Sequence, residues 1–293
     1  MSVPAAYLGI ILIWSTTPLA IKWSGEGGGF LFGITARMVI GALLCTLLMT
    51  LLARRFTWRR DAVLTYLASG LGIYGALLSV YWAAQTIPSG LLSVIYGFAP
   101  IATGVFASLW LGEAALTPVR LAGIGLGIAG LALIFGTGGS LGEQAVPGIA
   151  AVVLSVLFHS LSTVWVKAIG ARLPPLSTVT GGLLVAAPLF VLTWLLADGH
   201  WPAQLPARTW QSILYLSVVG SVLGFVLFYY VLQHLETGKV MLVTLITPVL
   251  ALLIGQGFNG EHIPPVVWLG TCCILLGMAI HQWGERLLRG RRS

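Results

Sequence analysis

Long apolar stretches separated by short polar turns run along the whole chain. A helix that crosses a bilayer needs about 20 mostly apolar residues, and ten segments reach that length. The predicted spans are residues 4–23, 30–52, 62–86, 89–111, 117–137, 147–169, 175–197, 209–233, 239–258 and 264–283. Because lipid offers the backbone no hydrogen-bond partner, each span is expected to be helical. The pattern therefore predicts an all-α membrane protein with ten transmembrane helices.

Turns rich in glycine and proline separate these spans. Examples are residues 24–29, Pro88-Ser89-Gly90, Gly138-Gly139-Ser140 and Pro264-Pro265. The first apolar run is long enough to span a bilayer, and no small-residue cleavage signature follows it. We therefore expect an uncleaved first helix and not a signal peptide.

The composition is typical of a protein dissolved in lipid. Hydrophobic residues make up 58% of the 293 residues and charged residues only 8%, whereas a soluble domain carries roughly 25% charged residues. Cys45, Cys272 and Cys273 lie in apolar segments without the spacing of metal ligands or of a disulfide framework. The sequence contains no nucleotide-binding loop, nucleophile elbow or catalytic His–carboxylate pair. We expect no enzyme activity, no cofactor and no metal.

The net charge of +7 is concentrated in a few loops and at the C-terminal end, which argues against a nucleic-acid partner. Lysine and arginine are enriched in the cytoplasmic loops of membrane proteins. If the N-terminus is cytoplasmic, the cytoplasmic side holds Arg54, Arg55, Arg59, Arg60, Arg120, Lys167, Arg172, Lys239, Arg286, Arg289, Arg291 and Arg292. The opposite side holds only Lys22 and Arg208, while Arg37 lies within the second span. Both termini are therefore predicted to face the cytoplasm.

The two halves of the chain repeat a set of residue types at a fixed distance. Tyr81, Gln85, Gly90, Pro100 and Glu113 recur 148 positions later as Tyr229, Gln233, Gly238, Pro248 and Glu261. A second match joins Trp14, Pro18 and Lys22 to His159, Thr163 and Lys167, and the spacing of four places each set on one helical face. Residues 1–140 and 141–293 are therefore predicted to be two repeats. Since each would hold five helices, an odd number, the second repeat is expected to be inverted in the membrane.

Together, these residues resemble the EamA family of the drug/metabolite transporter superfamily. The first helix carries a motif similar to the family's, which begins at Trp14 and ends at Lys22, and Arg37 follows in the second helix. The other matching positions are Tyr81, Pro100, Leu111-Gly112-Glu113, Gly123 and Gly130, and then Tyr229, Pro248, Gly260-Glu261, Gly270 and Gly277. The resemblance implies a ten-helix inner-membrane carrier, usually an exporter of amino acids or other small metabolites, with a cavity lined by helices 1, 3, 4, 6, 8 and 9. The chain departs from the family at His159, where many members carry tryptophan, and at Asn259, where leucine is usual.

Arg37 is the strongest candidate for contact with a substrate. It lies about two turns into the second span, and a charge at the bilayer centre costs at least about 2.5–3.5 kcal/mol. Such a side chain usually faces the bundle interior or a wet cavity. Two interpretations stay open: Arg37 reaches outward or clamps loop carbonyls, or it contacts a substrate carboxylate or a gate.

Three further polar residues have both a structural and a functional interpretation. Lys22 and Lys167 lie near opposite membrane faces, where they either anchor the helices or close one gate each. His159 lies in the middle of the sixth span, where it is either neutral and hydrogen-bonded or a proton acceptor or substrate contact, since histidine titrates near neutral pH.

The remaining candidates are aromatic, proline and glutamate side chains. Trp14, Tyr81, Tyr96, Phe225 and Tyr229 either line a cavity or anchor the protein at the membrane interface. Pro18, Pro100 and Pro248 are expected to kink helices 1, 4 and 9, either at a hinge or as fixed bends. Glu113 and Glu261 lie at span ends, where capping a helix or a turn is a simpler role than ion coupling.

The sequence therefore predicts a secondary transporter that works by alternating access. No Asp or Glu falls in the middle of a span, which argues against a pump for small organic cations. The favoured substrate is a zwitterionic or weakly anionic metabolite, with amino acids first. An exchanger of larger anions such as nucleotide-sugars and a membrane scaffold or sensor are the alternatives. The substrate, the direction, the coupling ion and the oligomeric state stay open.

Overall fold

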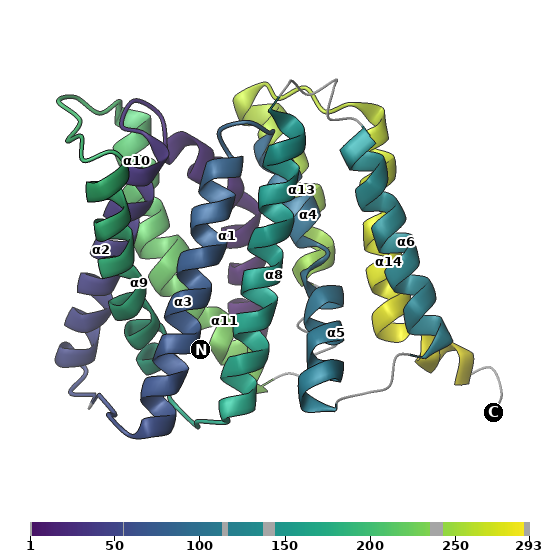
Figure 1. Ribbon diagram of the computed structural model, residues 1–293, viewed down its shortest axis with the longest axis horizontal. Coiled ribbons are helices and arrows are strands. Elements are labelled where there is room, and N and C mark those ends of the chain that lie inside the picture. The colour runs from purple at the N-terminus through teal and green to yellow at the C-terminus, as the bar shows by residue number, and fades with distance from the viewer. Residues whose placement is uncertain (1, 55, 113–116, 137–143, 235–242, 290–293) are drawn as a thin grey trace.

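The computed structural model describes residues 2–54, 56–112, 117–136, 144–234 and 243–289, and every regular element in these ranges is helical. The helices, in chain order, are α1 (Val3–Ser24), α2 (Phe30–Leu51), α3 (Arg60–Ala83), α4 (Ser89–Tyr96), α5 (Ala99–Leu111), α6 (Pro118–Gly136), α8 (Ala145–Ile169), α9 (Pro175–Ala197), α10 (Ala207–Tyr215), the π-helix η1 (Leu216–Leu223), α11 (Gly224–His234), α13 (Val243–Asn259) and α14 (Pro265–Arg289). They stand side by side as a bundle (Figure 1).

The helices account for the ten predicted spans. Among the described residues, eight helical stretches are long and apolar enough to cross a membrane, and two shorter apolar stretches, Ile246–Asn259 and Pro265–His281, complete the set. The prediction of an all-α membrane protein is confirmed, and the helix number agrees with ten spans. The inverted relation between the two halves and their division at residue 140 stay predictions.

The interior of the bundle is a continuous apolar core. The helix α3 packs against α8 and α9, while α4 packs against α13. Ile34, Leu91, Val152 and Leu183 are completely buried in this core. Large apolar side chains also cover the outer surface, as with Leu196, which is 80% exposed. Such a surface is stable only where lipid replaces water as the surrounding medium.

The fourth predicted span is one stretch of chain but two helices. The helix α4 ends at Tyr96 and α5 begins at Ala99, with Pro100 in the first turn of α5. Proline has no N–H to donate to the preceding turn, and the chain tightens here: Phe98 N donates to Ile95 O at 3.0 Å. Of the three predicted proline kinks, Pro100 coincides with a break. Pro18 and Pro248 lie inside α1 and α13, which continue through them.

The eighth predicted span also departs from a single α-helix. It consists of α10, the eight-residue π-helix η1 and α11. A π-helix carries an extra residue per turn and is frequent at functional sites. The apolar pattern of the sequence does not distinguish it from an α-helix.

The helices α6 and α14 form a pair at the right-hand edge of the bundle in Figure 1. Their backbones touch at glycines. A Cβ at Gly123 would lie 2.6 Å from the carbonyl oxygen of Gly277, and a Cβ at Gly130 would lie 2.6 Å from that of Gly270. Since any side chain would separate the two helices at these points, small residues are required here.

Candidate functional site

Arg37 is buried between three helices, in the first half of α2. Its side chain is 2% exposed. Nε donates to Ser221 Oγ of η1 at 3.0 Å, and Nη1 donates to Tyr81 Oη of α3 at 3.2 Å. Tyr81 is completely buried. We call these three residues the Arg37 cluster.

The hydrogen-bond partners of Arg37 are neutral hydroxyl groups. The four carboxylates that the structure describes pair elsewhere: Glu26 with Arg208, Asp61 with Arg59, Asp198 with His200 and Glu261 with Lys22. Within the described part of the chain, Arg37 therefore has no counter-ion. Burying a guanidinium that is held only by neutral groups is costly, because no opposite charge offsets the loss of water.

The π-helix supplies one wall of the Arg37 cluster. Gly220 lies beside the guanidinium, where an added Cβ would be 3.4 Å from Arg37 Nη2. The neighbouring Ser221, completely buried, accepts the hydrogen bond from Nε. A small residue next to a hydroxyl thus lets the two helices approach closely enough for the contact.

A second polar neighbourhood joins α3, α4 and α8. Tyr96 Oη and Ser155 Oγ are 2.5 Å apart, and Ser155 Oγ also donates to the carbonyl oxygen of Ala76. The half-buried ring of His159 lies 6.1 Å from that of Tyr96, centroid to centroid. Two predicted cavity residues, Tyr96 and His159, are therefore neighbours.

A third neighbourhood, which we call the Glu261 network, lies at the end of the bundle where α1 ends and α4 begins, the upper end in Figure 1. The Glu261 carboxylate accepts hydrogen bonds from Ser89 N and Ser89 Oγ, both at 3.0 Å, and from Asn259 Nδ2 at 3.0 Å. Lys22 Nζ is 3.5 Å from Glu261 Oε1. The predicted gate lysine thus pairs with the predicted capping glutamate.

The other predicted residues lie apart from these neighbourhoods. Trp14 packs against Phe228 of α11, with ring centroids 5.1 Å apart. Phe225 is half-buried against the apolar core, and Lys167 is exposed in the last turn of α8. Tyr229 belongs to α11, but its side chain is outside the described part of the structure, as is Glu113.

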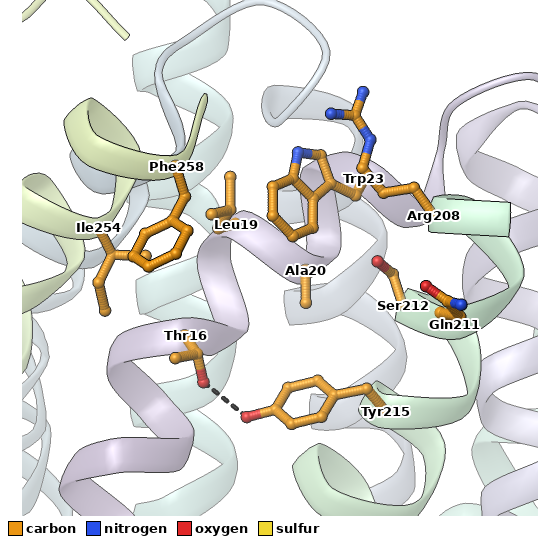
Figure 2. Close-up of a pocket in the computed structure, with 10 residues that line it drawn as sticks. All are labelled: Thr16, Leu19, Ala20, Trp23, Arg208, Gln211, Ser212, Tyr215, Ile254 and Phe258. Atoms are coloured by element: carbon orange, nitrogen blue, oxygen red, sulfur yellow. Dashed lines mark hydrogen bonds between the residues drawn. The ribbon is translucent and has the colours of Figure 1, made fainter. Parts of the chain in front are cut away.

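A groove of about 380 Å³ opens between α1, α10 and α13. Figure 2 shows the hydroxyls of Thr16 and Tyr215, which are 2.6 Å apart, at one side of it. At its rim the guanidinium of Arg208 lies 5.1 Å from the Trp23 ring centroid. The groove is lined by Thr16, Leu19, Ala20, Trp23, Arg208, Gln211, Ser212, Tyr215, Ile254 and Phe258. None of the predicted site residues lines it, so its place was not foreseen.

Four polar partners of the site were also missed by the sequence reasoning: Ser221, Ser155, Ser89 and Asn259. Serine is common inside membrane helices, where its hydroxyl can bond to its own backbone. No pattern in the sequence separates Ser221, Ser155 and Ser89 from the other serines. Only the position of Asn259, two residues before Glu261 in the repeated motif, offered a signal.

Ionisable side chains buried inside a bundle of apolar helices often mark the path of a substrate or an ion through a membrane protein. The chain belongs to the EamA-like transporter family, whose model matches residues 3–136 and 146–281. It is a multi-pass membrane transporter, and the relatives named below are transporters and not enzymes.

Several known proteins are similar to this chain. The uncharacterized transporter YvbV of Bacillus subtilis is 29% identical over 71% of this chain and 70% of its own length. A "probable terminal-alkyne amino-acid exporter" of Streptantibioticus cattleyicolor is 27% identical over 96% of this chain and 93% of its own. One solved crystal structure matches with a TM-score of 0.66 at 20% identity, covering 98% of this chain and 99% of that chain. That likeness concerns the fold alone.

Proposed function

We propose that the chain is an inner-membrane secondary transporter that exports amino acids or similar small carboxylate-bearing metabolites by alternating access. The observation that carries this proposal is the buried charge of Arg37, which receives no counter-ion from the part of the chain that the structure describes. A substrate carboxylate that reaches the guanidinium gains a charge-assisted, bidentate hydrogen bond. The buried arginine gains the counter-ion that the described residues do not give it.

The surroundings of Arg37 favour a zwitterion with an apolar side chain. Tyr96 and Phe225 provide aromatic surface in the same core, and aromatic rings combine an apolar wall with a polar edge. The relative from Streptantibioticus cattleyicolor carries a name that refers to amino-acid export. Export, with both termini in the cytoplasm and two inverted halves rocking around the centre, completes the proposal.

Larger organic anions fit this chain less well. A nucleotide-sugar carries two phosphate charges and calls for several cations in the cavity. Among the described residues, Arg37 is the one buried lysine or arginine. A scaffold or sensor role offers no explanation for a buried arginine to which the described residues give no counter-ion.

The test is counterflow in proteoliposomes. Vesicles loaded with one amino acid at a time are diluted into labelled tracer, and saturable tracer entry is followed. We expect counterflow with one group of amino acids, lost in Arg37→Ala and retained in Arg59→Ala, which removes an exposed arginine outside the candidate site. Decarboxylated analogues of the active substrates should fail to exchange. Equal counterflow by the Arg37→Ala protein would reject the carboxylate contact. No counterflow with any amino acid would reject the substrate class.

A further inference from the structure

We propose that Glu261 is the latch that closes one end of the transport path, by tying the N-terminus of α4 to α1 and α13. Release of this carboxylate is the step that opens that end. The inference rests on the proposed function, since a latch needs a path to close, and it assigns a positioning role to a residue outside the Arg37 cluster.

The first part of the latch is a helix cap supplied from a distant part of the chain. The N-terminus of α4 follows Pro88 and receives no side-chain cap from its own flanking residues. Glu261, in the turn between α13 and α14, accepts hydrogen bonds from Ser89 N at 3.0 Å and from Gly90 N at 3.5 Å. A carboxylate at a helix N-terminus also interacts favourably with the helix dipole.

The second part of the latch is a charge from α1. Lys22 Nζ lies 3.5 Å from Glu261 Oε1 and donates to the carbonyl oxygen of Ile87 at 3.2 Å. Next to it, Trp23 Nε1 donates to Asn259 Oδ1 at 2.9 Å, while Asn259 Nδ2 donates to Glu261. The carboxylate, only 5% exposed, is thus the point where α1, α4 and the end of α13 meet.

The three bonds from α4 to Glu261, donated by Ser89 N, Ser89 Oγ and Gly90 N, run between helices. Separating α4 from α13 therefore breaks all three at once, whereas a cap inside one helix would travel with it. At this contact the two backbones are close, because a Cβ at Gly90 would lie 2.6 Å from Leu252 Cα. The structure shows the bonded arrangement of this carboxylate, and the proposal adds a released one in which the interface opens.

The break after α4 allows this movement. The helix α4 has eight residues and is separated from α5 at Gly97 and Phe98. The proposed movement is a tilt of α4 about this junction. Its last residue is Tyr96, which contacts Ser155 and lies against the His159 ring. The helix α4 therefore connects the latch at its N-terminus with the second polar neighbourhood, around Tyr96, at its C-terminus.

The test measures how fast a thiol beneath the latch is alkylated. Ser93 lies one turn after Ser89 on the same face of α4 and is 8% exposed. Ser93→Cys is introduced after Cys45, Cys272 and Cys273 are replaced by serine or alanine, and a maleimide reagent is added to the purified protein. We expect Glu261→Gln to raise the alkylation rate about tenfold, the effect of losing hydrogen bonds to a charged group.

Glu26→Gln is the matched control. The Glu26–Arg208 pair is another glutamate pair at the same end of the bundle, with Arg208 Nη2 2.5 Å from Glu26 Oε2, but both side chains are at least one-third exposed. Its loss should leave the alkylation rate of the Ser93→Cys protein unchanged. If Glu261→Gln and Glu26→Gln give the same rate as the parent protein, the latch does not exist.

A charge exchange separates the cap from the ion pair. The double variant Lys22→Glu with Glu261→Lys restores opposite charges, but a lysine cannot accept hydrogen bonds from the N–H groups of α4. We expect alkylation to stay fast in this variant. Slow alkylation would mean that the ion pair alone closes the path, which overturns the proposal that Glu261 acts as the cap.

Two further measurements complete the test. If Glu261→Gln does not elute as a folded protein, Ser89→Ala takes its place, because it removes one hydroxyl donor only. Faster alkylation in Ser89→Ala supports the latch, and an unchanged rate overturns it.

Counterflow is measured with the same proteins. Fast alkylation in Glu261→Gln without counterflow of any amino acid in the parent protein leaves the latch standing and rejects the proposed substrate class. Counterflow in the parent with no change in alkylation rejects the latch alone.

Discussion

Arg37 and Glu261 are both almost fully buried charges, 2% and 5% exposed, yet their surroundings neutralise them in opposite ways. Arg37 is held by the hydroxyls of Ser221 and Tyr81, which carry no charge. Glu261 is held by backbone amides, by Asn259 and by the cation of Lys22. The difference teaches that burial alone does not identify a binding residue. The informative property is a buried charge whose counter-ion is missing.

The attraction between two charges shows how large the difference between Glu261 and Arg37 is. At an effective dielectric constant of about 20, two unit charges 4 Å apart attract each other by about 4 kcal/mol. For Glu261 that attraction is already made with Lys22 inside the folded protein. For Arg37 it is still available to an incoming anion.

The largest effect on transport is expected at Arg37. Arg37→Met keeps an apolar chain of similar length and removes the charge. We expect the counterflow rate to fall about 100-fold, because the attraction to a carboxylate is lost. At the same time the protein should become about 1–3 kcal/mol more stable, because no charge remains to be desolvated. Counterflow and unfolding in mixed detergent are measured on the same preparation, and a less stable protein would show that Arg37 is already compensated.

Glu261→Ala should move stability in the other direction. It leaves Lys22, the α4 amides and Asn259 without their shared acceptor, which costs about 2–3 kcal/mol. The same unfolding measurement compares it with Arg37→Met. Opposite signs for the two variants are expected, whereas a gain of stability on loss of Glu261 would show that the network costs more to bury than it returns.

Tyr81→Phe sharpens the description of the Arg37 cluster. It removes one hydroxyl partner of the guanidinium and leaves the ring and the charge in place. We expect about a tenfold weaker apparent affinity for the substrate in counterflow, since one hydrogen bond to a charged group is lost. An unchanged affinity would show that Tyr81 does not orient Arg37.

His159→Ala tests whether the second polar neighbourhood takes part in transport. The ordinary imidazole changes charge within the range of pH 6 to 8, and His159 lies against Tyr96. We expect the transport rate of the variant to be about threefold to tenfold lower than that of the parent, or its dependence on pH to be lost. Identical rates across pH 6 to 8 for parent and variant would remove His159 from the mechanism.

The smallest effect is expected at the exposed ion pair. Arg208→Ala removes the partner of Glu26 at the rim of the groove. Exposed pairs contribute about 0.2–1 kcal/mol, so stability should change by less than about 1 kcal/mol. A larger loss would show that the stacking of Arg208 on Trp23 holds α10 in place.

The sequence predicted the elements of this fold well and its contacts less well. Ten apolar runs of sufficient length are a strong signal, because the bilayer fixes the length of a spanning helix. Arg37 was identifiable for the same reason, as a charge inside such a run. The π-helix that brings Ser221 to it follows from packing between helices, for which a single apolar segment carries no signal.

The contrast between prediction and structure is clearest at Glu261. A capping role was expected from its position next to a turn. Its partners were not, because Ser89 lies on another helix far away in the sequence. Lys22 was expected to serve as an anchor or as a gate, and its distance from Glu261 could not be read from the spacing of residues. Local signals predict what an end of a helix needs, but not which part of the chain provides it.

The glycine contact between α6 and α14 has a consequence for the biogenesis of the protein. The ribosome completes α6 at Gly136 and reaches Pro265, the start of α14, only after α8 to α13 have been made. During this interval α6 lies in the bilayer without α14. The backbone at Gly123 and Gly130, which α14 contacts in the folded protein, is then uncovered. In a chain truncated before Pro265, this backbone surface of α6 stays uncovered. Until α14 is in place, this surface of α6 is therefore open to lipid or to another helix with small residues.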